Sequence, residues 1–354
     1  MPERHSGKGR LTRRALVFAS LGLLIVHSNQ LSPPLIQSPA FLDHGLAVGF
    51  SYSADEARGF LGQSDPEKLF EELCKRFATT STITSRNWVR TSWRQSNSDD
   101  QNLKDLDFQY NLADKYNLDV YQIIGADQCF NPNRFPPSSL SGLSLDDPKY
   151  IDGCIKENER NFAILQREGF LTKPRYIILG NESRTIFPDR PIPFSSMVVL
   201  TALKELADGV SIPTIANDFC SPQDYPQKSW QEIQTVADVV AIDLYSQVGE
   251  KLPDLDRTIA NLKLFKASSR KPMIVLEAQT RRWSENLPFA SQDQKNLFYL
   301  SAPFVNSYGF WEADKLVVFA KRFGNYYGDQ FCLKALEDNI AQADYWNRKF
   351  TGPG

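Results

Sequence analysis

Two glutamates in this 354-residue chain each follow a short apolar run. Residues 176–180 read YIILG and lead directly into Asn181 and Glu182, and residues 273–276 read MIVL and lead into Glu277. Apolar runs of this length suit strands that are buried on both faces. In a parallel barrel, functional side chains gather at the carboxyl ends of the strands. Two carboxyl groups placed there could serve as the pair that glycoside hydrolysis requires.

Retaining glycoside hydrolysis gives its two carboxyl groups different tasks. One protonates the leaving oxygen and the other attacks the anomeric carbon, at a separation of about 5–5.5 Å. We expect Glu182 to be the acid/base, with a pKa raised by burial and by the anionic Glu277 nearby. Glu277 must stay ionised as the nucleophile, and donors from Arg90 and Tyr245 would favour its charged form. Asn181 could hold a sugar hydroxyl beside the scissile bond.

Segments typical of strands and of helices alternate along the chain. Beyond the two runs above, we expect strands at 46–52, 87–93, 118–125, 213–219, 239–245 and 316–320, with 308–311 competing for the last place. We expect helices from about 66 and near 103–116, 148–168, 194–206, 255–266, 291–304 and 330–346. Eight strands alternating with helices indicate one (β/α)8 TIM barrel. A doubly wound sheet is disfavoured because no G-x-G-x-x-G turn is present.

Other side chains near the expected strand ends are candidates for substrate binding. They are Arg90, Trp93, Asn181, Tyr245, Gln279 and Trp283. The two tryptophans could stack on sugar rings, although barrel cores also use aromatic side chains. A single glutamate after a strand is ordinarily a solvated loop residue. The pair, with an asparagine directly before the first member, is what favours catalysis.

Composition excludes several other kinds of site. The formal net charge is −2, so no basic surface argues for a nucleic-acid partner. The three histidines are His5, His27 and His44, and the first two fall within the first 28 residues. One remaining histidine argues against a Ser-His-Asp triad, a Cys-His pair or a multi-histidine metal site. We therefore expect no cofactor and no metal.

The five cysteines do not form a recognisable framework. They are Cys74, Cys129, Cys154, Cys220 and Cys332, and no C-x-x-C pair occurs. An odd, widely spaced set indicates neither a dense disulfide scaffold nor a zinc ribbon. Isolated buried thiols and a Cys129–Cys154 disulfide both stay open.

Residues 1–28 are typical of a signal peptide. Basic residues precede a twelve-residue apolar run at 15–26, and Val26 and Ser28 fit a cleavage site before Asn29. The run is short for a membrane span, which needs about 20 residues. The segment TRRALV at 12–17 also resembles a twin-arginine export motif. We expect an extracellular or periplasmic protein, with an uncleaved membrane anchor as the alternative.

The remaining chain divides simply. Residues 29–44 contain the Ser-Pro sequences SPP and SP and predict an extended entry segment. Residues 45–354 show no linker and no low-complexity tail, so they predict one barrel domain.

Several motifs resemble those of a known group of enzymes. They are GFSYSADEARGFLG at 49–62, VRTSW at 89–93, LDFQYNLADKYNLDVYQIIG at 106–125, VVAIDLY at 239–245 and EAQTRRW at 277–283. With GNES at 180–183, the chain resembles clan A glycoside hydrolases, which are retaining (β/α)8 enzymes, and more narrowly the cellulase-like glycosyl hydrolases of bacteria. The resemblance runs from about residue 46 to residue 283.

The resemblance implies roles for particular residues. Glu182 would be the acid/base with Asn181 beside it, and Glu277 the nucleophile supported by Arg90 and Tyr245. The chain departs from the group where Ser183 and Arg184 follow the acid/base, since many relatives have proline there. The histidines that many cellulases carry around the site are also missing. These departures leave the sugar, the linkage and endo or exo action open.

Two other functions compete with a retaining β-glycosidase. Asp127, Glu182 and Asp218 end three successive expected strands, as Mg²⁺ ligands do in enolase-type barrels. That chemistry also needs a lysine or histidine base, and none is evident at the sixth or seventh strand end. A catalytically inactive carbohydrate-binding barrel is the other alternative. The intact pair of Glu182 and Glu277 argues against it.

Overall fold

The computed structural model describes the barrel and much of its surrounding layer. The described residues are 45–52, 66–78, 86–94, 97–124, 138–144, 146–180, 194–219, 227–246, 254–280, 287–310, 313 and 327–351. Among them, the side chains of Asp218 and Gln279 are not described. Residues 1–44 lie outside these ranges, so the signal peptide and the entry segment stay predictions.

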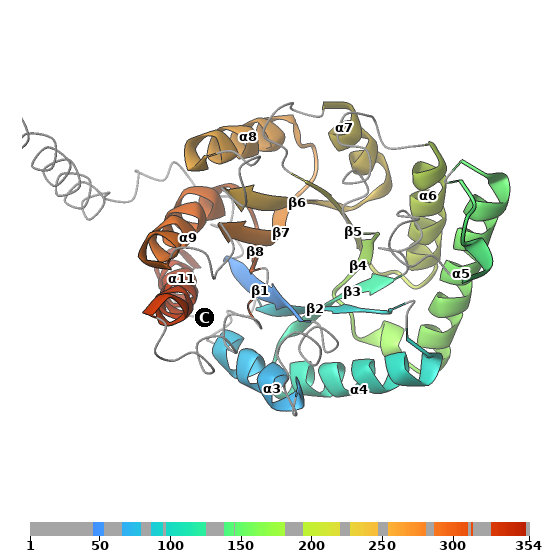
Figure 1. Cartoon of the computed structure of the whole chain (residues 1–354), viewed down its shortest axis with the longest axis horizontal. Helices are drawn as coiled ribbons and strands as arrows, with labels where there is room; N and C mark the ends of the chain where they lie inside the picture. Colours follow the sequence, from blue (N-terminus) through green and yellow to red (C-terminus); the bar gives the residue numbers. More distant parts are fainter. Residues whose placement is uncertain are drawn as a thin grey trace, which may run out of the picture. The chain divides into compact units, whose positions relative to one another are not determined.

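Eight parallel strands close into a barrel in chain order (Figure 1). They are β1 (Ala47–Ser51), β2 (Trp88–Ser92), β3 (Asp119–Ile124), β4 (Tyr176–Leu179), β5 (Thr214–Phe219), β6 (Val239–Ser246), β7 (Met273–Thr280) and β8 (Ser307–Phe310). Pairing of β1 with β8 completes the closure. Parallel neighbours need crossover connections, and helices supply them around the outside. The predicted single (β/α)8 TIM barrel is confirmed.

The helices follow the strands as the alternation predicts. They are α3 (Pro66–Phe77), α4 (Asp99–Lys115), α5 (Pro148–Arg167), α6 (Phe194–Gly209), α7 (Gln227–Val236), α8 (Leu255–Ser268), α9 (Leu287–Ser301) and α11 (Tyr327–Thr351), with 3-10 turns η1 (Ser138–Leu140), η2 (Phe170–Thr172) and η3 (Ala302–Phe304). The helix α7 was not predicted from the sequence. Its signal was present, because Trp230, Ile233 and Val236 recur every three residues and are buried.

The predicted eighth strand at 316–320 is wrong. The strand that closes the barrel is β8, Ser307–Phe310, which corresponds to the competing segment at 308–311. In β8, Tyr308 pairs with Val275 of β7, and Ser307 pairs with Ala47 of β1. The segment LVVFA has the stronger strand propensity, while Gly309 weakens that of β8. Ser307–Phe310 is the eighth strand because it pairs with both β7 and β1 and so closes the barrel. Residues 316–320 lie outside the described part of the chain.

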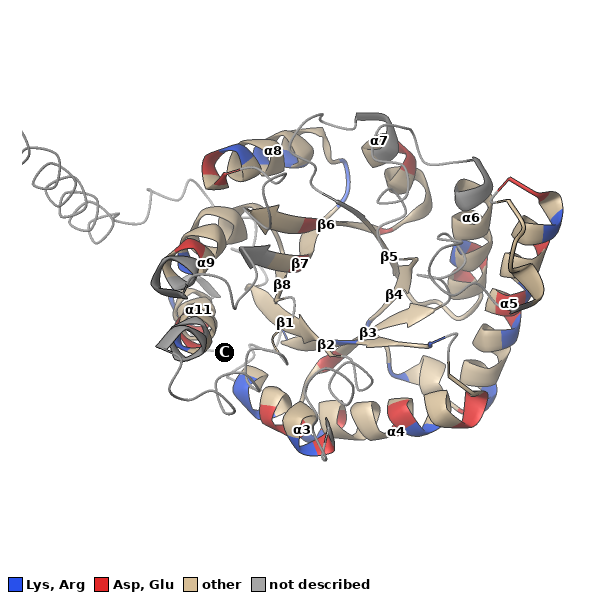
Figure 2. Ribbon diagram, in the orientation of Figure 1, with Lys and Arg blue, Asp and Glu red and all other residues tan. Residues whose placement is uncertain are grey.

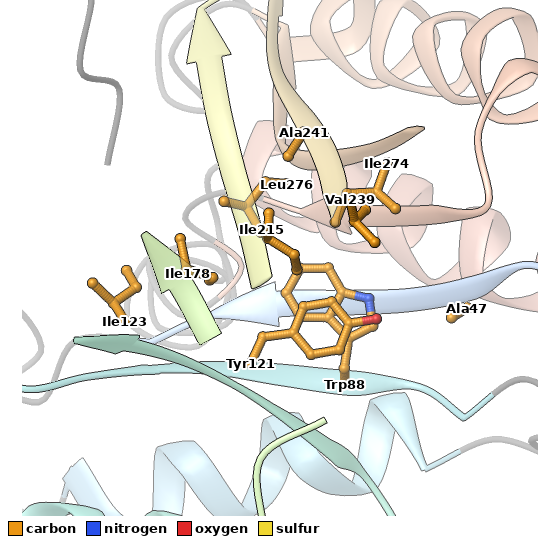
Figure 3. Close-up of a cluster of buried hydrophobic side chains, with 10 residues drawn as sticks. All are labelled: Ala47, Trp88, Tyr121, Ile123, Ile178, Ile215, Val239, Ala241, Ile274 and Leu276. Carbon is orange, nitrogen blue, oxygen red and sulfur yellow. The ribbon is translucent and has the colours of Figure 1, made fainter. Parts of the chain in front are cut away.

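A tryptophan fills much of the barrel interior. The indole of Trp88 stacks on the ring of Tyr121 at a centroid distance of 4.3 Å (Figure 3). The indole Nε1 donates to Ser307 Oγ at 2.6 Å. A Cβ on Gly49 or on Gly309 would overlap the indole. The two glycines on β1 and β8 therefore provide the room that this ring occupies. The interior is a packed core, as is usual for such barrels, and not a pore.

Apart from Trp88 and Tyr121, the interior cluster is aliphatic. Its members are Ala47, Trp88, Tyr121, Ile123, Ile178, Ile215, Val239, Ala241, Ile274 and Leu276. Charged side chains lie mainly on the surrounding helices, and the strands carry few of them (Figure 2). A charged residue on an interior strand face is therefore unusual in this molecule and needs a separate explanation.

Asp119 is one such residue, at the first position of β3. It shares a strand face with Tyr121, and its carboxylate oxygens lie 3.4 Å from Arg86 Nη1 and 3.8 Å from Arg175 Nε. Burial raises the pKa of Asp119, against the opposing effect of the two arginines. A raised carboxyl pKa means that the folded state binds the proton more tightly than the unfolded state does. The contribution of Asp119 to stability is therefore lost as pH rises through its folded pKa.

We expect Asp119→Asn to stabilise the protein at neutral pH by up to about 1 kcal/mol. The gain should shrink when the pH falls below about 4, where the unfolded carboxyl also takes up its proton. Urea denaturation of both proteins at pH 7 and pH 4 measures the two differences. A variant that is much less stable than the wild type at pH 7 would show that the ion pairs outweigh the cost of burial.

Candidate active site

Three charged side chains are buried among the residues that the structure describes. Arg90 on β2, Asp243 on β6 and Glu277 on β7 have exposed fractions of 7%, 0% and 2%. A buried charge is costly unless hydrogen bonds or an opposite charge compensate it. The contacts among these groups therefore decide what the site can do.

Both carboxylate oxygens of Glu277 receive a donor. Arg90 Nη1 donates to Oε1 from β2, and the Tyr245 hydroxyl donates to Oε2 from β6. Both contacts were expected from the sequence, and both are present. Such donors favour the ionised form of a carboxyl group and fix its orientation. The Glu277 carboxyl group is thus held in a fixed orientation inside the barrel by a guanidinium and a phenol, whereas its catalytic role is a separate matter.

A β-bulge turns Glu277 toward the interior. The pairing of β6 with β7 runs from Ala241↔Ile274 to Ile242↔Val275 and then to Asp243↔Glu277, so that Leu276 has no partner. Regular alternation would place Leu276 and Glu277 on opposite faces of the strand. Leu276 belongs to the interior cluster, yet Glu277 reaches Arg90 across the barrel. The extra residue in the bulge allows both side chains to face inward.

The sequence predicted Glu277 directly after its strand, but Glu277 lies within β7. The strand β7 continues to Thr280, because its pairing with β6 extends to Ser246↔Thr280. The bulge also brings the carbonyl oxygen of Leu276 against β8, where a Cβ on Gly309 would overlap it. A glycine is therefore required opposite the bulge. This requirement explains a residue that weakened the strand signal of β8.

The other predicted site residues are only partly described. Asn181, Glu182, Trp283 and Asp127 lie outside the described residues, and only the backbones of Gln279 and Asp218 are described. Gly180, directly before Asn181, has a φ of 69°. This left-handed conformation favours glycine and turns the chain immediately after β4. Trp93 has an exposed fraction of 3%, so its ring has little surface on which a sugar could stack.

Two interior polar residues, Asn217 and Asp243, were not predicted from the sequence. Asn217 on β5 donates from Nδ2 to Asp243 Oδ2 on β6 at 2.7 Å, and both side chains are buried. A signal for Asp243 was available, since it precedes Tyr245 by two residues and therefore shares its strand face. Polar residues inside the apolar runs 213–219 and 239–245 were the second clue.

Other predictions concern metals, thiols and membranes. In the described ranges, no group of three or more histidine, cysteine, aspartate or glutamate side chains is arranged to hold a metal ion. Burial raises the pKa of the Cys74 thiol to about 12, so this cysteine is unreactive. The Cys129–Cys154 disulfide stays a prediction because Cys129 is not described. None of the described helices has the length and apolarity to span a bilayer.

Comparison with known proteins gives different results for sequence and structure. No protein-family model matches the sequence, and no curated protein resembles it significantly. Solved structures do match. A GH5_18 protein from Streptomyces cattleya in complex with GlcNAc has a TM-score of 0.61 at 12% identity, with 88% of this chain and 82% of that chain covered.

Two further solved structures have the same fold. The exo-β-1,4-mannosidase Op5Man5 from Opitutaceae bacterium strain TAV5 has a TM-score of 0.59 at 17% identity, over 90% of this chain and 63% of that chain. A GH5-4 broad specificity endoglucanase from an uncultured bacterium has a TM-score of 0.55 at 12% identity, over 84% and 95%. At these identities the likeness concerns the fold. The chain therefore shares its (β/α)8 barrel fold with these solved structures.

We expect Arg90 and Glu277 to be strongly coupled in stability. Arg90→Met leaves a buried carboxylate without its cation and should cost about 3–5 kcal/mol. In the double variant with Glu277→Gln the loss should be smaller than the sum of the two single losses by about 1–3 kcal/mol. Urea denaturation of the four proteins measures this difference. Additive losses would show that Arg90 and Glu277 do not interact measurably in the free energy of unfolding.

We expect Gly309→Ala to disturb both the fold and the position of Glu277. The added methyl group meets the Leu276 carbonyl and the Trp88 ring, and overpacking against backbone should cost about 3 kcal/mol. Gly209→Ala is the matched control, because a Cβ there meets nothing within 4 Å and α6 would gain up to about 1 kcal/mol. Thermal unfolding compares the two. Equal melting temperatures would contradict the described contact.

Proposed function

We propose that this protein is a retaining glycoside hydrolase that cleaves a β-linked glycoside or polysaccharide. The observation that carries the proposal is the environment of Glu277. It is a buried carboxylate on β7 that faces the barrel interior, with a guanidinium on one oxygen and a phenol on the other. A carboxylate held ionised and in a fixed orientation is what a nucleophile in double displacement needs.

The proposed reaction has two steps. In the first, a Glu277 oxygen forms a bond to the anomeric carbon while the glycosidic C–O bond breaks, and Glu182 gives its proton to the leaving oxygen. In the second, Glu182 takes a proton from water as the water oxygen displaces Glu277, which regenerates both groups. Arg90 and Tyr245 orient the nucleophile throughout. Glu182 is assigned from its position in the sequence, two residues after Gly180, which directly follows β4.

The substrate is proposed only as a class. The similar structures include proteins named as an exo-β-1,4-mannosidase and a broad specificity endoglucanase, and one structure contains GlcNAc. These names support a carbohydrate substrate for the present chain, without choosing a sugar. We assign sugar contacts to Asn181, Gln279 and Trp283, with no nucleic-acid partner and no cofactor.

We further propose that the enzyme is exported. The basic segment and twelve-residue apolar run of residues 1–28 support this proposal, with cleavage before Asn29. A retained leader would instead hold the barrel at a membrane surface. N-terminal sequencing of protein recovered from the periplasm or the medium distinguishes the two outcomes.

The direct test is hydrolysis of aryl β-glycosides, soluble β-glucans and β-mannans by wild type, Glu277→Ala and Glu182→Ala. Both variants should lose at least about 10³-fold in kcat on the substrate that the wild type cleaves. Azide should restore turnover of Glu277→Ala with inverted product, because a small anion can occupy the space of the missing carboxylate. Glu168→Ala, a change at an exposed position of the α5 terminus, is the control and should keep full activity.

The other outcomes each contradict part of the proposal. Variants that retain the wild-type rate would place the catalytic groups elsewhere in the barrel. Binding of a glycan without hydrolysis by the wild type would favour an inactive carbohydrate-binding barrel. Loss of activity in EDTA would favour a Mg²⁺-dependent reaction.

A further inference from the structure

A second carboxyl group lies directly beside Glu277. Asp243 is its partner in the register between β6 and β7, and neighbouring strands are about 4.8 Å apart. Asp243 is fully buried, and it lies on the strand face that also carries Tyr245. Because the bulge turns Glu277 inward, the two carboxyl groups project from adjacent strands into the same interior space.

The environment of the pair contains few other charges. Among the described residues, Arg90 reaches Glu277 from β2, across the barrel, and Asp243 and Tyr245 face it from the neighbouring strand β6. The interior positions of β8 carry Ser307 and Gly309, neither of which titrates. Glu182, from outside the described residues, is expected as a further carboxyl group. Among these described groups, Arg90 pairs with Glu277, and Asp243 accepts a hydrogen bond from Asn217.

We propose that Asp243 is a positioning residue of the glycosidase site, where its carboxyl group acts on Glu277 through charge while it anchors Asn217. This inference rests on the proposed function for its catalytic meaning. Two like charges at paired positions on strands about 4.8 Å apart, both buried, repel strongly enough to change proton affinity by about tenfold or more. A negative charge on Asp243 thus repels one on Glu277, while Arg90 and Tyr245 donate to the Glu277 carboxylate.

The Asn217 amide gives Asp243 a second property that can be tested. Its Nδ2 donates to Asp243 Oδ2 at 2.7 Å, which fixes the carboxyl group between β5 and β7. An asparagine at position 243 could accept the same hydrogen bond without the charge. Exchanging the two residues would keep an amide–carboxyl pair but move the carboxyl group to β5, one strand farther from Glu277. These two changes separate the charge from the hydrogen bond.

The experiment is a titration of the Glu277 side-chain carboxyl carbon by NMR in protein labelled with [δ-¹³C]glutamate. Glu277→Gln identifies its signal. In Asp243→Asn the midpoint should fall by about one pH unit, which is about a tenfold weaker proton affinity. The Asn217→Asp/Asp243→Asn exchange should also titrate below the wild type. Asp119→Asn, which removes an interior-facing carboxyl group at the first position of β3, should leave the midpoint unchanged.

Activity supplies the second measurement. The acidic limb of kcat/KM against pH reports the ionisation of the free nucleophile, so it should move to lower pH in Asp243→Asn and stay in place in Asp119→Asn. A midpoint within about 0.2 units of the wild type in folded Asp243→Asn would overturn the proposal. If that variant does not fold, the exchange variant decides in the same way. A wild type that hydrolyses nothing would contradict the proposed function, while the NMR titration would still test the coupling.

Discussion

The site depends on how one buried negative charge is compensated. A carboxylate that is 2% exposed inside a barrel cannot persist as an anion without donors, and Glu277 has one on each oxygen. The two donors come from β2 and β6, so the charge links three strands that lie apart in the sequence. Its ionised state therefore requires a closed barrel. Fold and chemistry are coupled through this single group.

The packing beneath the site follows from that requirement. For Glu277 to face inward directly after Leu276, β7 must contain an extra residue, and the displaced carbonyl needs a glycine opposite it on β8. The same glycine, with Gly49, makes room for Trp88, whose ring stacks on Tyr121 inside the barrel. The rigid interior then supports the charged groups. The identities of Gly49 and Gly309 are thus fixed by the packing around Trp88 and Glu277.

Much of the barrel could be predicted from the sequence, because apolar runs and helical periodicity alternate along most of its length. The contacts of Glu277 with Arg90 and Tyr245 were also accessible, since all three residues lie near the carboxyl ends of their expected strands. The eighth strand was not, because its selection depends on closure with β1 and not on propensity. The bulge was equally hidden, since alternation within 273–280 gives no sign of an extra residue. Asp243 was overlooked because a carboxyl group in an apolar run contradicts the burial that the run itself predicts.

The central claim is that Glu277 is the catalytic nucleophile, and trapping the covalent intermediate tests it most directly. A 2-deoxy-2-fluoro-β-glycoside with a good leaving group, chosen for the sugar that the enzyme cleaves, should form the glycosyl-enzyme faster than water removes it. Peptide mass spectrometry should then find one added sugar, attached to Glu277. A label on another residue would contradict the account. So would enzyme that, after prolonged treatment with the fluoro-glycoside, carries no label and still hydrolyses ordinary substrate.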